Sequence, residues 1–322
     1  MKINRFHTAI QYTISAIVLI IACLTVFLPN STFGFKMLDY NSHLMIGLLL
    51  LGFGGLIVNY RILMTTSLIA CMSMCLFLKN ASNDTLVMPS VNTEPKLSIA
   101  HFNVSNIQDL DHLSQTITDI DVDIISFQEL TPDWNYILQD ILKEKYPYNM
   151  SVVRIDPYGM AFYSKQEFAS MDTFLFNNKP NLEAEIKVDD QKILLYSSYL
   201  VPAISNTNAV ATKDHLDLLS HKIRDNKAPA IALGDYNMVY WANAISRFRS
   251  KAQVIHSRRD VSEDGLTPPY DHIFFTTDLE CTSFHNINDL QENHIGIMGV
   301  YQIKSHQVEI EESPITLSSL EL

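Results

Sequence analysis

The sequence predicts an α/β protein, in which a two-layer β-sandwich flanked by helices follows three transmembrane helices. Between Lys96 and Lys304, many short apolar runs end in polar or turn residues, and few segments have helical periodicity. The first 79 residues instead hold three apolar runs and a single acidic residue, Asp39. No internal repeat is visible.

The three apolar runs all lack Lys, Arg, Asp and Glu, and they extend over residues 8–28, 43–58 and 62–78. A signal peptide is the alternative for the first run, but no small-residue cleavage site follows it and two further runs do. Each run is long enough to be a candidate span, although the second and third are at the short end. Lys2, Arg5 and Arg61 then predict, by the positive-inside rule, a cytoplasmic N-terminus and an extracytoplasmic C-terminal part.

Charge is unevenly distributed along the chain. Residues 1–79 contain five of the 23 basic residues and one of the 35 acidic ones, which leaves a formal charge of −16 on the remainder. A surface of that sign repels long polyanions, whereas a small phosphate ester that reaches a metal ion in a pocket is penalised less. Cys281 is the one cysteine after residue 79, so no intramolecular disulfide and no Cys/His zinc spacing is expected there.

The chain divides into four parts by composition. Residues 1–79 are predicted to be the membrane anchor, and residues 80–95, which are polar with two prolines, a linker. Residues 96–305 form the predicted globular domain, and residues 306–322 an acidic tail.

Within the domain, apolar runs and helical periodicity predict the elements. Strands are expected in residues 96–103, 121–130, 148–155, 159–165, 182–188, 192–202, 228–235, 270–275, 279–284 and 296–303. Helices are expected in residues 109–119, 131–147, 206–225 and around 241–248. Thr131 is the predicted N-cap of the second helix, with Pro132 in its first position.

The stretch from Ala228 to Asn237 sets the pattern for the candidate site. A buried strand runs into Gly234, Asp235, Tyr236 and Asn237, and if the chain stays extended Asp235 and Asn237 point to one face. An ordinary turn is the simpler explanation, since Gly, Asp and Asn are turn residues. Polar groups close five other strands in the same way, however: Asn103, Glu129, Tyr199, Asp271 and His294.

With these residues in this order, the sequence resembles the endonuclease/exonuclease/phosphatase superfamily, which includes exonuclease III, pancreatic deoxyribonuclease, neutral sphingomyelinases and inositol phosphatases. The resemblance covers about Lys96 to Lys304 and implies the deoxyribonuclease-like sandwich. With the preceding apolar runs, it looks like a membrane-anchored bacterial branch, which implies a multi-pass protein of the inner (plasma) membrane with its catalytic domain outside the cytoplasm.

The resemblance implies a metal-dependent phosphoesterase, because hydrolysis of such esters needs a hard cation, an activated water and support for the leaving oxygen. Glu129 looks like the principal ligand of Mg²⁺ or Mn²⁺, with Asn103 and position 293 beside it. The expected partner is a phosphate-ester substrate, namely nucleic acid, a lipid headgroup or a small phosphoester. No protein partner can be inferred.

The remaining roles are implied in the same way. Asp235 would orient or deprotonate the water, and Asn237 and Tyr199 would contact the phosphate. Asp271 would hold the ring of His294 so that its other nitrogen faces the phosphate. Whether Asp235 or His294 is the general base stays open.

Two departures from the family pattern affect the expected activity. Asn293 precedes His294 where the family has an aspartate, and Ser105 stands where the exonuclease III branch has an acid. The loss of a negative charge at position 293 is expected to weaken metal binding. A catalytically weakened or inactive relative that acts as a binding module is therefore the alternative function.

Overall fold

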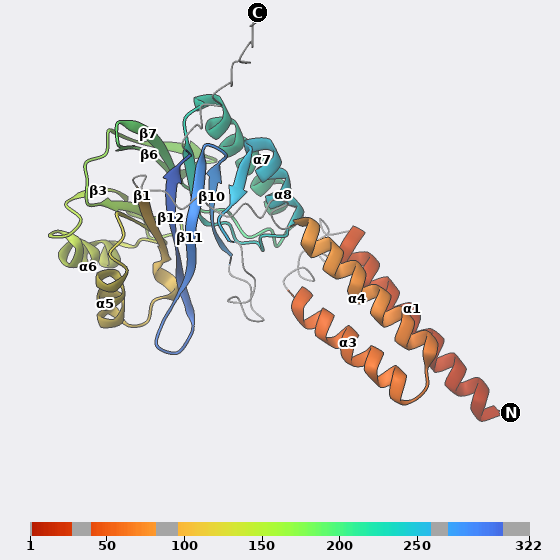
Figure 1. Cartoon of the computed structure of the whole chain (residues 1–322). Helices are drawn as coiled ribbons and strands as arrows, with labels where there is room; N and C mark the ends of the chain where they lie inside the picture. Colours follow the sequence, from red (N-terminus) through yellow and green to blue (C-terminus); the bar gives the residue numbers. More distant parts are fainter. Residues whose placement is uncertain (1, 28–39, 82–95, 259–269, 305–322) are drawn as a thin grey trace, which may run out of the picture.

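The computed structural model of the chain describes residues 2–27, 40–81, 96–258 and 270–304. The acidic tail 306–322 and nearly all of the predicted linker 80–95 lie outside these residues, so both stay predictions. Figure 1 shows a β-sandwich with helices on its outer faces and a separate bundle of N-terminal helices that projects from it.

The sandwich consists of two six-stranded sheets, which confirms the predicted two-layer architecture. The first sheet has the spatial order β11 (Leu279–Asn288), β12 (His294–Ile303), β1 (Lys96–Asn103), β2 (Ile124–Gln128), β4 (Met160–Ser164) and β3 (Tyr148–Val152). The second has the order β5 (Ser170–Phe176), β6 (Lys179–Val188), β7 (Gln191–Ser197), β8 (Ala230–Asp235), β10 (Asp271–Thr276) and β9 (Val254–His256). Both sheets are mixed, because β1–β2 and β7–β8 are parallel pairs and the other neighbours are antiparallel.

Each sheet has a pair of helices on its outer face. The helices are α5 (Leu110–Ile120) and α6 (Pro132–Leu142) on the first sheet, and α7 (Asn206–Asn226) and α8 (Asn243–Ala252) on the second. The predicted cap is confirmed, since Thr131 Oγ1 accepts a hydrogen bond from the backbone N–H of Trp134. Its hydroxyl thereby satisfies one of the donors that the first turn of a helix leaves free.

Three apolar clusters fill the spaces between these layers. One lies between the two sheets and includes Ile99 of β1 and Leu233 of β8. The second and third lie between each sheet and its own helices. The alternation of side chains along each strand therefore decides whether a residue faces the other sheet or the helices.

Two strands were not predicted from the sequence. β5 has mostly exposed side chains at the edge of its sheet, so it lacks the apolar run that marks the buried strands. β9 is three residues long, too short for any periodicity to be recognised.

The first and last strands of the sandwich are neighbours in the middle of the first sheet. β1 and β12 pair in antiparallel register from Lys96 opposite Gln302 to Phe102 opposite Gly296. The beginning of β12 therefore lies at the edge of the sheet where β1 ends.

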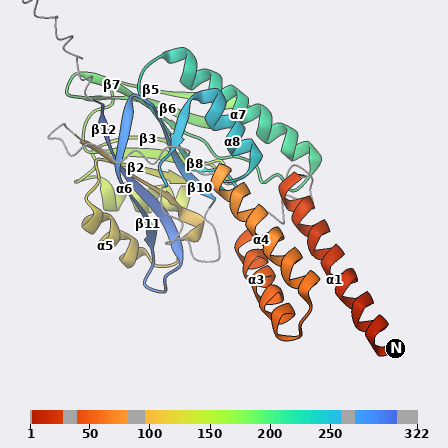
Figure 2. The ribbon, with the colours of Figure 1, turned by 45° about the vertical axis from the view of Figure 1, so that its right-hand side comes forward.

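The N-terminal bundle consists of α1 (Lys2–Phe27), α3 (Asn41–Ile57) and α4 (Arg61–Ala81). Figure 2 shows the three helices side by side, projecting from the sandwich. They pack through small and aliphatic side chains such as Ala22, Leu48 and Ala70. Large apolar side chains on their outer surface, for example Leu50 and Phe53, are more than half exposed.

Among the described residues, two helices are long and apolar enough to cross a membrane, where the sequence predicted three. They are the segments His7–Phe27 of α1 and Arg61–Leu78 of α4. α3 is apolar but has 17 residues, which at 1.5 Å per residue is a little less than the ~30 Å of a hydrocarbon core. The bundle meets the sandwich at the end of α4, where Phe77 and Leu78 pack against the core beneath α7 and α8.

Candidate active site

Polar side chains from both sheets gather at one end of the sandwich. Asn103 ends β1, Glu129 follows the neighbouring parallel strand β2, and Asp235 ends β8 in the other sheet. The antiparallel neighbours contribute their first residues at the same edge, so Asp271 of β10 lies opposite Asp235 and His294 begins β12. Strand direction alone thus brings together residues that are up to 191 positions apart in the sequence.

The side chain of Asn103 connects the two sheets. Its Nδ2 donates to Glu129 Oε1 at 2.9 Å and to Asp235 Oδ2 at 3.3 Å. Its Oδ1 accepts from the backbone N–H and the hydroxyl of Ser105 at 3.0 and 2.8 Å. Two carboxylates from different sheets therefore lie within hydrogen-bond distance of one nitrogen atom.

The backbone at Glu129 has a left-handed conformation, with φ of 59°. Such a conformation costs a non-glycine residue roughly 1–3 kcal/mol and is held only where the surroundings fix it. The β3–β4 loop does so: Leu130 N–H donates to Gly159 O, and Arg154 N–H donates to Leu130 O. A Cβ at position 159 would lie 2.1 Å from Leu130 O, so this close approach requires glycine.

Asp271 and His294 form an ion pair of 2.7 Å between Oδ2 and Nε2. Because a carboxylate only accepts hydrogen bonds, Nε2 carries the proton and Nδ1 is directed elsewhere. Burial by itself would raise the pKa of Asp271, but the charge of His294 and its hydrogen bond outweigh burial and lower the pKa to about 2. Asp271 therefore stays ionised and orients the ring.

Asp235 is shifted in the opposite direction. Burial, together with the charges of Asp271 and Glu129, raises the pKa of Asp235 to about 7. The hydrogen bonds that Asp235 accepts from Asn237 N–H and Asn103 act against this rise without cancelling it. In this environment Asp235 can exchange a proton near neutral pH, which is a property of general acids and bases.

Asp235 and Asn237 were expected to share a face if the chain stayed extended. The chain does not stay extended after Asp235. β8 ends at Asp235, and Asn237 has φ of 51°. Instead, the backbone N–H of Asn237 donates to Asp235 Oδ1 at 2.8 Å, and its Nδ2 donates to Leu200 O at 2.9 Å. Asn237 still lies beside Asp235, but through a turn rather than a strand.

Tyr199 lies at the edge of this group. Its hydroxyl is hydrogen-bonded to Asn237, and Glu129 and Asp235 are close enough to act on it electrostatically. Burial is the main reason that its pKa is raised above the usual value, so it stays a neutral phenol. Its ring packs edge-on against Tyr158 at 5.5 Å between centroids.

Within the described part of the chain, the hydrogen bonds of Asn293 are made with Asp289 rather than with the other site residues. Asn293 lies on the turn between β11 and β12, where its Nδ2 donates to Asp289 Oδ2 at 2.9 Å and its backbone N–H to Asp289 Oδ1 at 2.7 Å. The predicted metal-ligand position is thus occupied by a side chain that is hydrogen-bonded within its own turn.

Two further residues lie near the site: Gln128, which the sequence showed only as the neighbour of Glu129 in the family pattern, and His101, which was not singled out. Gln128 is buried and its Oε1 accepts the backbone N–H of Asp235 at 2.7 Å. His101 is buried beneath Asp271 and His294, and burial lowers its pKa to about 4 although the charge of Asp271 acts in the opposite direction. The available signal for His101 was a titratable residue in the middle of the apolar run IAHF.

The donor atoms fit a hard divalent cation. In the described residues no three His, Cys, Asp or Glu side chains are grouped as a complete metal site. Mg²⁺, however, is commonly held by one or two carboxylates, with water and substrate oxygens as its remaining ligands. Glu129 and Asp235 provide such carboxylates, and Asn103 could reach the ion through Oδ1 after giving up its bonds to Ser105.

The sequence profile of the Endonuclease/Exonuclease/phosphatase family matches residues 100–293. No curated protein matches the chain significantly.

Solved structures of similar fold include D. rerio TDP2 complexed with a single-strand DNA product, with 17% identity and a TM-score of 0.52 over 64% of this chain and 99% of that one. The human Nocturnin catalytic domain with bound sulfate has 14% identity and a TM-score of 0.53, covering 66% and 97% of the two chains. A Bacteroides vulgatus endonuclease/exonuclease/phosphatase has 16% identity and a TM-score of 0.53, covering 65% and 99%. At these identities, the likeness concerns the fold.

Proposed function

Because the chain belongs to the endonuclease/exonuclease/phosphatase family, we propose that it is a membrane-tethered, divalent-metal-dependent phosphoesterase. The observation that carries this proposal is the convergence of Glu129 and Asp235 on Asn103, beside the ion pair of Asp271 and His294. Glu129 and Asp235 have no ion pair with a Lys or Arg of the described residues, and together with the oriented imidazole they would combine a cation-binding group with a proton-transfer group.

Glu129 and Asn103 would hold Mg²⁺ or Mn²⁺, which when bound neutralises charge on the phosphoryl oxygens. Asp235, which lies beside Asn103, would orient the attacking water or accept a proton from it. His294, held by Asp271, would present Nδ1 to the phosphate and stabilise the charge that develops there. The reverse assignment, with His294 as the base, is chemically possible in the same arrangement.

Asn237 and Tyr199 would contact the substrate at the edge of the site. Both are neutral hydrogen-bond donors beside Asp235, and such donors can bind a phosphoryl oxygen without adding charge. Asn293 has a smaller role in this proposal than in the family pattern, because its amide is engaged by Asp289.

The substrate is a phosphodiester or phosphomonoester of nucleic acid, lipid or small-molecule origin. The formal charge of −16 after residue 79 disfavours tracking along a long polyanion. A non-catalytic binding module is the second candidate, supported by the neutral residue at position 293.

For the anchor, we propose that α1, α3 and α4 all cross the inner membrane of a bacterium, with the sandwich outside the cytoplasm. The support is the exposed apolar surface of the bundle, together with Arg61 at the start of α4. A reporter fused after Lys304 should be active in its extracytoplasmic form. Activity restricted to a cytoplasmic reporter would contradict the orientation.

The function is tested with the full-length protein in detergent. We expect turnover of bis-p-nitrophenyl phosphate that requires Mg²⁺ or Mn²⁺, is abolished by EDTA and is lost in Glu129→Gln. Single-stranded DNA, a phospholipid and p-nitrophenyl phosphate, tested in parallel, separate the substrate classes. A folded wild-type protein that neither binds the metal ions nor hydrolyses any of these substrates would favour the binding module.

A further inference from the structure

A row of buried polar side chains crosses the otherwise apolar core between the two sheets. Gln128 Nε2 donates to Ser197 Oγ at 3.1 Å, and Ser197 Oγ lies 3.3 Å from Ser126 Oγ. Ser126 Oγ in turn lies 3.3 Å from His101 Nδ1. All four side chains are fully buried, so this polar row is part of the interior beneath the candidate site.

The hydrogen bonds of this row have a defined direction. Asp235 N–H donates to Gln128 Oε1, so the carboxamide is fixed with Nε2 as its donor toward Ser197. If each hydroxyl passes the direction on, Ser197 O–H donates to Ser126 and Ser126 O–H donates to His101 Nδ1. Nδ1 is then an acceptor, and the proton of the neutral imidazole is on Nε2.

The hydrogen bonds of the row end at the ring of His101, whose Nε2 atom is one of two buried atoms considered next. His101 Nε2 and Asp271 Oδ1 are both inaccessible to solvent, and neither has a hydrogen bond within the described residues. One belongs to the first sheet and the other to the second, and Asp271 is the carboxylate that acts most strongly on His101. A buried N–H and a buried carboxylate oxygen that both lack partners are complementary, because each is costly alone.

The position of His101 on its strand agrees with this pairing. It lies two residues before Asn103, so its side chain points to the same face of β1, toward the second sheet. Its neighbour in register on β12 is Ile297, whose side chain also belongs to the core between the sheets.

We propose that His101 is a positioning residue that donates its Nε2–H to Asp271 Oδ1. This bond would fix the carboxylate plane of Asp271, so that Oδ2 is presented to His294. The polar row would thus connect the backbone of Asp235 in β8 to the carboxylate of Asp271 in β10. His101 touches neither substrate nor metal in this arrangement, and its effect is exerted through His294.

Three variants of the full-length protein test the proposal, which for this readout rests on the proposed function. His101→Gln keeps a donor at the position of Nε2, His101→Asn keeps a polar atom only at the position of Nδ1, and His101→Leu keeps neither. We expect His101→Gln to retain kcat within about threefold, and the other two to lose about 10–100-fold with KM nearly unchanged. Melting temperatures of all three show whether each variant is folded.

Two kinetic outcomes would overturn the proposal. Either folded His101→Asn and His101→Leu keep the wild-type kcat, or folded His101→Gln loses as much activity as His101→Leu. The second result would mean that the ring matters for packing alone.

A measurement that needs no catalysis separates this inference from the proposed function. In the wild-type protein labelled with ¹⁵N-histidine, the resonance that is lost in His101→Gln should have the spectrum of a neutral ring protonated at Nε2. It should also shift in Asp271→Asn. A ring protonated at Nδ1 would overturn the inference even in an active enzyme, and a protein inactive on every substrate could still show the expected tautomer.

Discussion

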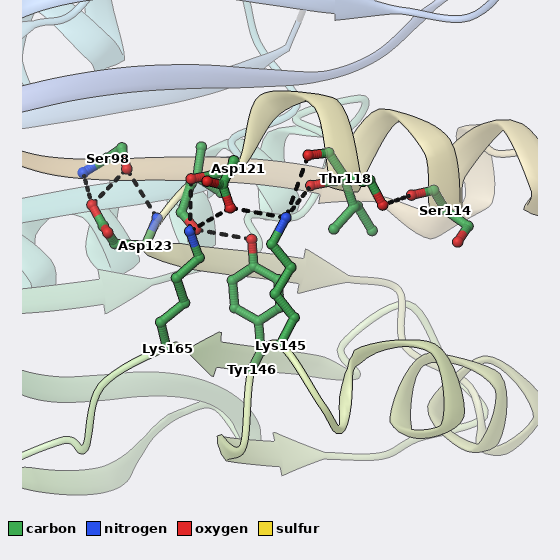
Figure 3. A network of polar contacts seen from close by, with 10 residues as sticks. Ser98, Ser114, Thr118, Asp121, Asp123, Lys145, Tyr146 and Lys165 are labelled. Carbon is green, nitrogen blue, oxygen red and sulfur yellow. Dashed lines mark hydrogen bonds and ion pairs between the residues drawn. The ribbon is translucent and has the colours of Figure 1, made fainter.

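The two ends of strands β1 and β2 both carry acidic side chains, but under opposite electrostatic conditions. At the beginning of the strands, Asp121 pairs with Lys145 at 2.9 Å and Lys165 at 2.7 Å, as Figure 3 shows. Asp123 accepts hydrogen bonds from the backbone N–H and the hydroxyl of Ser98 at 2.8 and 2.6 Å. Every acid in this network therefore has basic or N–H and O–H partners of its own.

At the other end, no lysine or arginine of the described residues forms an ion pair with Glu129, Asp235 or Asp271. Their partners are the amide of Asn103, backbone N–H groups and His294. The pKa of Asp121 is accordingly lowered to about 2, first by the hydrogen bonds from its lysines, whereas burial raises the pKa of Asp235 to about 7. The acids at one end are thus paired with lysines and hydrogen-bond donors, whereas Glu129 and Asp235 at the other end have no ion pair with a lysine or arginine of the described residues.

Truncating one carboxylate at each end of strands β1 and β2 should affect activity at one end and stability at the other. Glu129→Ala should lower metal-dependent kcat by about 10³-fold or more, because it removes the main metal-binding carboxylate. Asp123→Ala should leave kcat unchanged and lower the melting temperature by about 3–10 °C, because both donors of Ser98 lose their acceptor. Steady-state kinetics and thermal unfolding of both variants check this, and equal losses of activity would contradict the division between the ends.

Removal of the imidazole that is hydrogen-bonded to Asp271 should affect both activity and stability. His294→Ala should reduce kcat by about 10²–10⁴-fold, since it removes a proton-transfer or charge-stabilising group. The folded pKa of Asp271 is below its ordinary value of 3.8, so its ionised form stabilises the fold above that pH, and the contribution is lost as the pH falls toward about 2. Without His294 this contribution should already be missing at pH 7, which thermal unfolding at pH 7 would reveal.

A double substitution tests whether the uncharged residue at position 293, where the family has an aspartate, weakens metal binding. Asn293→Asp alone would bring its carboxylate against that of Asp289, so we expect little gain in metal affinity. The double variant Asn293→Asp with Asp289→Asn keeps the hydrogen bond with its polarity reversed and the net charge unchanged. It should lower the Mg²⁺ concentration for half-maximal activity about two- to fivefold. An unchanged value would show that position 293 has no influence on the metal.

The raised pKa of Asp235 predicts that the stability of the metal-free protein depends on pH. The folded pKa of Asp235 lies above its ordinary value of 3.8, so the folded state holds a proton that the unfolded state releases. Stability from this group is therefore present below pH 4 and is lost as the pH rises to about 7. In EDTA, the melting temperature of Asp235→Asn should fall less over this pH range than that of the wild type, and Mg²⁺ should offset the wild-type loss. Parallel curves for both proteins would contradict the assignment.

The smallest effect is expected at the exposed ion pairs. Lys165→Met removes one of two lysines from Asp121, which is well exposed, so the melting temperature should change by no more than about 2 °C. Salt should reduce even this difference. Lys165 and Lys145 both also donate to backbone carbonyl groups, of Asp121 and of Ile117 and Thr118 respectively, so Lys145→Met is expected to behave similarly.

The sequence predicted the buried strands well because apolar runs between polar ends are a local signal. β1, β2 and β8 each have such a run, whereas the exposed edge strand β5 has none. The same logic located Asn103, Glu129 and Asp235. In the structure both carboxylates accept a hydrogen bond from Asn103, while the catalytic roles stay predictions.

What the sequence could not show depends on contacts across the chain. The partner of Asn293 is fixed by the geometry of its turn. The charge that acts on buried His101 comes from Asp271, which is 170 positions away and in the other sheet. A polar residue within a strand gives no indication of what it faces. Local patterns therefore identified the ends of strands but not the interior polar row.

The pairing of the first strand with the last has a consequence for how the domain is made. Since β12 lies between β11 and β1, the central part of the first sheet is incomplete until the last strand has been synthesised. Such long-range pairing slows folding, because the entropy of closing a large loop is lost before the contacts form. The nascent domain would therefore stay open and vulnerable to proteases until Ile303 has emerged. A chain shortened by β12 would lose His294 and the centre of its sheet together, so we expect it to be degraded rather than to persist as an inactive enzyme.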